Sequence, residues 1–286
     1  MIGNISMFLQ DFKTLRQWRN FAISSFACLG VVGTVLQTTN VINPNITFFQ
    51  GPYILLVVVL FSICVGLFMS WPKPITQDYS SPRTRISIVE GDILLQPTHI
   101  VIGTNDTFDT ETPVIIDGNS LQGQALRRLY GDDRAELDRQ LAAALLGKAI
   151  VGTVDKLGKK SRYGVGAIAT LIHSPRLIFF LAYCEMDANN NASSTPDKVW
   201  KSLILLWNEV SRRGNGGALS IPVIGGGHAR LSSVLPAQDA IRLLALSFMF
   251  ASRRARVCEE LRIVVQRSEY QKLDRLELQA FLSSLR

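Results

Sequence analysis

Cysteine and histidine are scarce in this sequence, and neither type is clustered. Four cysteines and three histidines are spread over 286 residues. Cys28 and Cys64 lie in apolar runs, and Cys184 and Cys258 stand far apart in the rest of the chain. This distribution excludes a disulfide framework and the ligand spacing of a zinc site. We therefore expect no bound metal, and no residue pattern identifies a catalytic group.

Charge is missing from a long stretch near the N-terminus. No Asp, Glu, Lys or Arg occurs from Phe21 to Pro72, although charged residues make up 19% of the chain. Two apolar runs within it, at about 21–37 and 53–71, flank a polar, uncharged segment around Asn43. Because lipid or a very dry core must receive such a stretch, the sequence predicts two transmembrane helices. A signal peptide at the first run, or two buried helices of a soluble protein, are the alternatives.

Basic residues flank this uncharged stretch on both sides. The segment between the two apolar runs has none, whereas three precede the first run and three follow the second: Lys13, Arg16, Arg19, Lys73, Arg83 and Arg85. The positive-inside rule therefore predicts a two-pass protein with both termini in the cytoplasm. Residues 1–20 alternate apolar and basic positions near helical spacing, which predicts an amphipathic segment in the membrane interface.

The chain carries an overall excess of positive charge. A formal charge of +7 and a pI near 9.4 would suit a nucleic-acid-binding protein. The excess is dispersed, however: three basic residues against Asp11 give +2 in residues 1–20, and the remaining +5 has no basic run beyond Arg253, Arg254 and Arg256. We therefore expect no nucleic-acid partner.

The remainder of the chain has the pattern of an α/β domain. Residues 72–84 contain three prolines and are predicted as an extended linker, so the domain is expected at 85–286. The expected strands are 85–93, 99–105, 149–157, 165–173, 177–186, 218–224 and 261–266, and the expected helices are 120–131, 132–147, 195–214, 236–251 and 268–285. The expected helix caps and stops are Ser120, Asp132, Thr195, Gly131, Gly147 and Gly214. This order predicts helices on both faces of a mixed sheet.

One predicted strand runs directly into three glycines. In ALSIPVIGGGHARL the strand at 218–224 is followed by Gly225, Gly226 and Gly227. Such a backbone turns tightly and can point its N–H groups at an anion, which favours a phosphate site. A flexible connector is the alternative for the same residues.

Two other predicted strands end in polar residues. Asp92 and Ile93 close the first, and Thr104 and Asn105 close the second. A carboxylate can accept a hydrogen bond from an exocyclic amine such as that of adenine, and an Asn amide can hold a ribose hydroxyl. Each signal alone is weak, because Asp and Asn are common turn residues.

Taken in order, these elements resemble the macro domain, an ADP-ribose-binding α/β fold. The resemblance extends from about Arg85 to the C-terminus and is carried by EGDI at 90–93, Asn105, GNSLQGQAL at 118–126 and IPVIGGGHARL at 221–231. It implies a three-layer α/β/α domain whose ligand is an ADP-ribose derivative, with no further cofactor. The ligand-binding residues that it implies are Asp92, Ile93, Thr104, Asn105, Ser120, Leu121, Ile224, Gly225, Gly226, Gly227, His228 and Ala229. Among them, Asp92 and Ile93 would contact adenine, Asn105 the distal ribose, and the loop 225–229 the diphosphate.

One segment departs from the macro-domain pattern. The family's first phosphate loop is commonly a run of glycines, whereas this chain has TFDTETPVIIDGNS. The departure argues against hydrolysis of ADP-ribose linkages. It also implies a reshaped pocket in which Asp106, Asp109 and Glu111 are available to an additional group on the ligand.

Two membrane spans ahead of such a domain resemble a narrower group, the transmembrane macro effectors of Thoeris antiphage systems. In that group a TIR-domain partner makes an ADP-ribose-derived signal, and the effector binds it, assembles and damages the membrane. The resemblance implies a homo-oligomer in the bacterial inner membrane that acts on the lipid bilayer. The alternatives are a membrane-tethered macro hydrolase and a non-catalytic anchor for ADP-ribosylated proteins.

Overall fold

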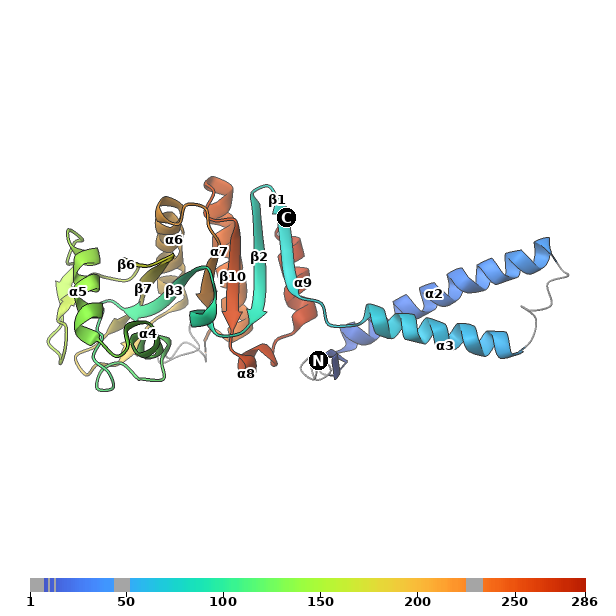
Figure 1. Cartoon of the computed structure of the whole chain (residues 1–286), viewed down its shortest axis with the longest axis horizontal. Helices are drawn as coiled ribbons and strands as arrows, with labels where there is room; N and C mark the ends of the chain where they lie inside the picture. Colours follow the sequence, from blue (N-terminus) through green and yellow to red (C-terminus); the bar gives the residue numbers. More distant parts are fainter. Residues whose placement is uncertain (1–7, 10, 13, 44–51, 225–233) are drawn as a thin grey trace. The chain divides into compact units, whose positions relative to one another are not determined.

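The chain divides into two compact units. The computed structural model describes residues 8–9, 11–12, 14–43, 52–224 and 234–286. The first unit comprises residues 1–73 and 274–276, and the second comprises residues 74–273 and 277–286. Figure 1 draws both, and each unit is described by itself.

Two apolar helices form the first unit. Helix α2, Leu15–Ile42, begins at Thr14, whose hydroxyl accepts a hydrogen bond from the backbone of the first turn. It packs against α3, Pro52–Met69. The contact is close at Gly66, because a Cβ there would lie 2.0 Å from Oγ of Ser25. A small residue at this position therefore lets the two helices approach each other.

Helix α2 is long and apolar enough to cross a membrane. The second apolar helix is shorter, with Tyr53–Met69 as its apolar part, so within the described ranges one helix meets both the length and the composition required. The second span stays a prediction. Residues 15–20 of the interfacial segment predicted at 1–20 are the first turns of α2, and the interfacial location stays a prediction.

The second unit is built on an eight-stranded sheet, in which seven strands lie side by side. The order is β1-β2-β10-β9-β3-β7-β6, and β8 pairs with β7. The five inner strands are parallel, whereas the edge strands β1 and β6 are antiparallel to their neighbours. The strands are β1 Ile75–Ser80, β2 Arg83–Glu90, β3 His99–Asn105, β6 Ile168–His173, β7 Arg176–Met186, β8 Ala192–Ser193, β9 Leu219–Pro222 and β10 Glu260–Val265. The predicted mixed sheet is thus confirmed.

Helices cover both faces of this sheet (Figure 1). They are η2 Ile93–Leu95, α4 Leu121–Tyr130, α5 Arg134–Leu145, α6 Pro196–Arg213, α7 Ala237–Arg254, α8 Arg267–Tyr270 and α9 Arg275–Ser284. On one face Ile102 and Phe180 pack in a core with Leu137 and Leu141 of α5. The alternate strand residues, such as Phe179, point to the other face, where α6 contacts β7 and α7.

The predicted linker is wrong. Within residues 72–84 the structure has strand β1, whose residues alternate between buried and accessible positions. The hydroxyl of Tyr79 donates to the backbone oxygen of Leu282 over 2.7 Å, which ties β1 to α9. The prolines lie just outside the strand or in the turn after it, so they limit β1 without preventing it. The domain therefore begins near residue 74, not 85.

Three further predictions need correction. The segment 149–157 is not a buried strand: it contributes only β4, Gly152–Thr153, which pairs with β5, Ser161–Arg162, outside the main sheet. The last predicted helix is broken between α8 and α9. The cap of α5 is Asp133, because Asp132 has φ of +63° and continues the left-handed turn of Gly131. The caps at Ser120 and Thr195 are confirmed.

Candidate functional site

Of the predicted ligand-binding residues that the structure describes, Asp92, Ile93, Thr104, Asn105 and Ile224 lie at one edge of the sheet. Since β2, β10, β9, β3 and β7 are parallel, their carboxyl ends share that edge. Asn105 ends β3, Asp92 follows β2 by two residues, and Ile224 follows β9 by two residues. Ligands of open α/β sheets bind outside this edge. Gly225, Gly226, Gly227, His228 and Ala229 lie outside the described residues.

Asp92 has partners within the protein. One carboxylate oxygen accepts from the backbone N–H of Leu94 over 2.9 Å, and the other accepts from Arg128 over 2.6 Å. The side chain is 37% exposed, so its remaining lone pairs stay accessible. The Ile93 side chain is buried in the core, which leaves its backbone to meet a ligand.

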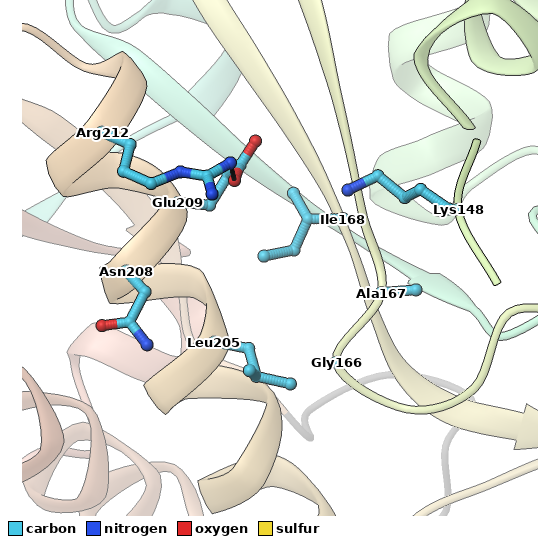
Figure 2. Close-up of a pocket in the computed structure, with 8 residues that line it drawn as sticks. All are labelled: Lys148, Gly166, Ala167, Ile168, Leu205, Asn208, Glu209 and Arg212. Carbon is cyan, nitrogen blue, oxygen red and sulfur yellow. Dashed lines mark hydrogen bonds and ion pairs between the residues drawn. The ribbon is translucent and has the colours of Figure 1, made fainter. Parts of the chain in front are cut away.

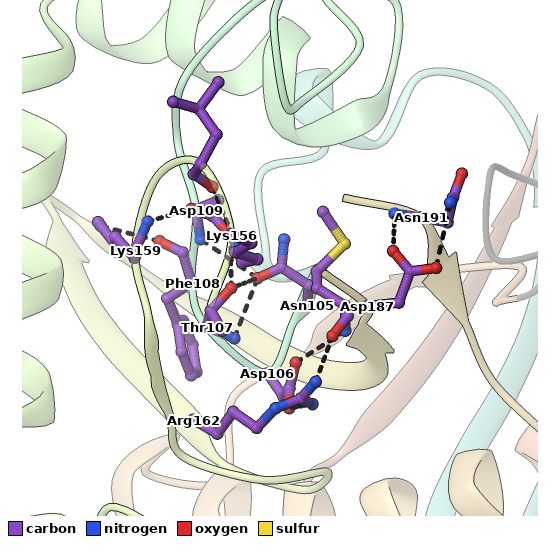
Figure 3. Close-up of polar contacts among 12 residues, drawn as sticks. Asn105, Asp106, Thr107, Phe108, Asp109, Lys156, Lys159, Arg162, Asp187 and Asn191 are labelled. Carbon is purple, nitrogen blue, oxygen red and sulfur yellow. Dashed lines mark hydrogen bonds and ion pairs between the residues drawn. The ribbon is translucent and has the colours of Figure 1, made fainter. Parts of the chain in front are cut away.

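Asn105 is held in one orientation. Its side-chain oxygen accepts from the backbone N–H groups of Thr107, over 3.1 Å, and Asp109, over 3.2 Å. Because backbone N–H groups only donate, the side-chain atom that accepts from both is the amide oxygen of Asn105, and its other terminal group is the NH2. Figure 3 shows these bonds converging on the oxygen. No described residue accepts from the NH2 group, so Asn105 presents a hydrogen-bond donor.

A buried carboxylate lies behind Asn105. Asp109 is 1% exposed, and its Oδ2 atom lies 2.7 Å from Nζ of Lys156, which is fully buried. Its Oδ1 atom accepts from the backbone N–H of Lys159 over 2.8 Å. The hydroxyl of Thr107 also contacts Oδ2. That hydroxyl has one proton, and because a carboxylate can only accept, the proton points to Asp109.

Asp106 also faces inward. Its carboxylate accepts from the backbone N–H of Met186 over 3.0 Å and from Arg162 over 2.5 Å, and its exposed fraction is 1%. The expectation that Asp106 and Asp109 meet an additional ligand group is therefore wrong. Both carboxylates are occupied by donors from the segment between α5 and β6, which lies far away in the sequence. Glu111 is 38% exposed on its side chain and lies 3.7 Å from Arg134.

The turn after β3 contains a strained residue. Phe108 has φ of +53°, a left-handed conformation that costs a bulky residue about 1–3 kcal/mol. Its buried ring contacts Tyr163 edge to face, with centroids 5.7 Å apart. The polar contacts on either side of Phe108 hold this conformation, as is usual where a site is preorganised.

Helix α4 begins beside the same turn. Ser120 caps it, accepting from the backbone N–H of Gly123 over 3.1 Å and donating to the backbone oxygen of Asp117. The side chain of Gln122 donates to the backbone oxygen of Asp109. Leu121 packs on the core. The first turn of α4 is thus tied to the turn after β3 through Asp109, and a helix N-terminus favours an anion.

Two titratable side chains of β3 and β7 are either buried or lie away from this edge. Burial, with Asp106 nearby, raises the pKa of the Cys184 thiol to about 12, so it stays protonated at neutral pH. His99 lies at the opposite, amino end of β3, where its ring contacts the backbone of Leu177 and Gly214. Within the described ranges no three His, Cys, Asp or Glu residues are grouped to hold a metal ion.

A separate pocket lies beside the edge strand β6. Its volume is about 340 Å³, and Figure 2 shows its lining: Lys148, Gly166, Ala167, Ile168, Leu205, Asn208, Glu209 and Arg212. None of the predicted ligand-binding residues contributes to it. The candidate site lies instead at the strand ends, since the predicted glycine loop follows β9.

The sequence did not reveal the supporting residues of the site. Lys156, Lys159 and Arg162 reach the turn after β3 from about fifty residues away. Their only sequence signal is the run DKLGKKSR, which contains Gly158. Basic runs are common on protein surfaces, so this run did not by itself predict a contact with Asp106 or Asp109.

Comparison with known proteins identifies the family. The family model described as "Thoeris protein ThsA, Macro domain" matches residues 86–266, more than half of the chain. No curated protein matches the sequence. A point mutant of the Oceanobacillus iheyensis macrodomain superposes with a TM-score of 0.50 at 12% identity, over 74% of this chain and 96% of that chain.

Two further solved structures of that macrodomain are similar. A second mutant has a TM-score of 0.49 at 14% identity, over 73% of this chain and 98% of that one. The macrodomain with ADP has a TM-score of 0.49 at 13% identity, over 74% and 99%. Identities this low concern the fold alone, and the family assignment rests on the match over residues 86–266. The chain belongs to the family of Thoeris ThsA macro domains.

Proposed function

We propose that this protein is a membrane-anchored receptor for an ADP-ribose-derived nucleotide. The observation that carries the proposal is Asn105, whose amide is locked so that it offers a donor at the carboxyl edge of the sheet. A donor there suits an oxygen acceptor such as a ribose hydroxyl. Asp92 would accept from adenine, and the 225–229 loop with the N-terminus of α4 would bind the diphosphate.

The N-terminal unit would anchor this receptor in the bacterial inner membrane. We propose that α2 and α3 both span the bilayer, with both termini in the cytoplasm. The absence of charge from Phe21 to Pro72 supports this, because each charge at the centre of a bilayer costs about 2.5–3.5 kcal/mol on insertion scales. Residues 52–71 reach the length of a span when α3 is extended by its last turn.

The functional consequence would be assembly in the membrane. A TIR-domain partner would make the nucleotide signal, and binding would bring copies together until their helices damage the bilayer. Ser62 and Gly66 pack within one chain, against α2, so they are not free for contact between copies. The outer face of α2, with Ala27, Gly30 and Thr34 exposed, offers small residues that allow close helix contact.

A hydrolase is the second candidate. It would need a positioned water and a general base. The inward-facing Asp106 and Asp109 and the protonated Cys184 do not supply one, which favours a receptor. The non-catalytic anchor would bind ADP-ribosylated proteins without changing its own assembly.

One experiment separates these functions. Purified full-length protein in lipid nanodiscs is mixed with ADP-ribose, O-acetyl-ADP-ribose and an ADP-ribosylated protein. A receptor binds the small ligands without turnover, and in proteoliposomes the TIR product increases both oligomer size and dye leakage. Multiple turnover would establish a hydrolase instead. Binding only to the modified protein, with sealed vesicles, would establish an anchor.

A further inference from the structure

Asp109 and Lys156 form an ion pair that is buried in the domain. Its N–O distance is 2.7 Å, and the two side chains are 1% and 0% exposed. Removing two charges from water is costly, so such a pair is a weak source of stability and often serves to select one conformation. The question is which conformation this pair selects.

The chain is shaped around the Asp109 carboxylate. Residues 156–159 wrap around it, and Gly158 sits against it with φ of +87°. A Cβ on Gly158 would lie 2.6 Å from Oδ1 of Asp109 and 2.3 Å from Cδ1 of Ile115. Only glycine fits there, both for its conformation and for space. The backbone at Gly158 is therefore shaped to fit the Asp109 carboxylate, so the contact between residues 156–159 and Asp109 is part of the fold.

Asp109 is connected to Asn105 in two ways, through its own backbone N–H and through Thr107. The backbone N–H of Asp109 donates to the Asn105 oxygen over 3.2 Å. The hydroxyl of Thr107 contacts the Asp109 carboxylate, and the N–H of Thr107 is the second donor to Asn105. Any shift of Asp109 therefore moves both donors that orient the Asn105 amide (Figure 3).

Residues other than Lys156 also attach its segment to the domain. The segment 148–164 is attached to the domain at other points, where Lys159 binds Asp138 over 2.5 Å and Arg162 binds Asp106 over 2.5 Å. Apart from Asp109, the one described hydrogen-bond partner of the Lys156 ammonium is the backbone oxygen of Leu157. The distinct role left for Lys156 is to hold the carboxylate.

We infer that Lys156 and Asp109 are positioning residues that hold the turn after β3 so that Asn105 presents its NH2 group to the ligand. This inference rests on the proposed function, in which Asn105 binds the nucleotide. The pair acts through Asn105 and does not itself touch the ligand. Removing the pair should weaken nucleotide binding only in protein that has Asn105.

The test uses full-length protein in nanodiscs with ADP-ribose as the probe. Lys156→Met removes the ammonium and keeps the apolar stem. Lys160→Met is the matched control, because Lys160 pairs with Asp155 at an exposed position in the same segment. We expect Lys156→Met to raise Kd about tenfold, the range of a lost charge-assisted hydrogen bond, and Lys160→Met to leave it within twofold.

A double-mutant cycle shows whether the effect passes through Asn105. In an Asn105→Ala background, Lys156→Met should change Kd by less than twofold. An equal tenfold loss with and without Asn105 overturns the inference, and so does an unchanged Kd in folded Lys156→Met. Should Lys156→Met not fold, the neutral pair Asp109→Asn with Lys156→Met replaces it, with the same expected loss.

A measurement without ligand separates this inference from the proposed function. Hydrogen exchange of the backbone amides at 105–111 reports the donors of Thr107 and Asp109 directly. Faster exchange in Lys156→Met, but not in Lys160→Met, is expected whether or not ADP-ribose binds. If wild-type protein shows no ADP-ribose binding, the proposed function fails while exchange still decides the positioning role. Unchanged exchange overturns the inference.

Discussion

The indole Nε1 of Trp207 donates a hydrogen bond to Oγ of Ser247 over 3.0 Å, and this bond joins α6 to α7. Both residues are fully buried. The Ser247 hydroxyl in turn donates to the backbone oxygen of Leu244 over 2.9 Å. Each polar atom of this contact is therefore satisfied inside the core that supports the sheet.

We predict that Ser247→Ala lowers the free energy of unfolding by about 1–3 kcal/mol, because the indole N–H stays buried without an acceptor. Urea unfolding in detergent, followed by tryptophan fluorescence, measures this loss. The control is Ser211→Ala, since the Ser211 hydroxyl bonds to Arg256 at an exposed position. Its effect should stay within about 0.5 kcal/mol. Equal losses in both variants would contradict the prediction.

Asn105→Asp tests which group Asn105 offers. The new carboxylate still accepts from the N–H groups of Thr107 and Asp109, so the turn keeps its bonds while the NH2 donor is lost. We expect ADP-ribose affinity to fall about tenfold or more, and the melting temperature to fall as well, because Asn105 is 3% exposed and the new charge is buried beside Asp109. Calorimetry and thermal unfolding measure the two quantities. Unchanged affinity would show that the donor is not used.

The glycine loop is expected to hold the diphosphate. Gly226→Glu places a side chain and a like charge where phosphate would lie, and should abolish binding of ADP-ribose without unfolding the domain. Gly152→Glu is the matched control, because a Cβ at Gly152 meets no atom within 4 Å. It should bind normally. Calorimetry that finds the same affinity in folded Gly226→Glu as in the control would remove the assignment.

Cysteine labelling tests the proposed membrane topology. Cysteines are introduced at Asn43 or Ser80 in a background with Cys28→Ala and Cys64→Ala, while Cys184 and Cys258 are buried and stay in place. Asn43→Cys should react with an impermeant maleimide from the periplasm. Ser80→Cys, at an exposed position, should react only after the inner membrane is opened. The reverse pattern would refute the topology.

Alkaline pH should destabilise the domain through its buried thiols. Burial raises the pKa of both Cys184 and Cys258 from about 9 to about 12. Between these values the unfolded thiols lose protons that the folded ones keep, so the free energy of unfolding falls as pH rises, by about 1.4 kcal/mol per pH unit and thiol. Urea unfolding at pH 8, 9 and 10 should show a smaller slope in Cys184→Ser. An identical slope would contradict this.

Local patterns in the sequence correctly predicted most elements of the domain. Helix caps at Ser120 and Thr195 depend on side chains that bond within three residues, so sequence neighbours decide them. The hairpin of β6 and β7 was visible because two apolar runs meet at Ser174 and Pro175. The residues at the strand ends could be chosen because the polar position follows directly after the strand.

Long-range partners decided what the sequence left open. Residues 75–80 form a strand because β2 and α9 lie beside them, whereas within residues 149–157 only β4 is a strand, and its partner is β5 outside the main sheet. Nothing local separates these two segments, since β-structure depends on the pairing partner more than on the residues themselves.

Local sequence patterns were enough to place polar residues at the carboxyl ends of the strands and to find the uncharged stretch from Phe21 to Pro72. The inward direction of Asp106 and Asp109 and the donor offered by Asn105 became visible only in the folded chain. Lys156 and Arg162, about fifty residues away, occupy those carboxylates. The role of a carboxylate depends on which charge lies within about 4 Å of it, and that distance exists only after folding.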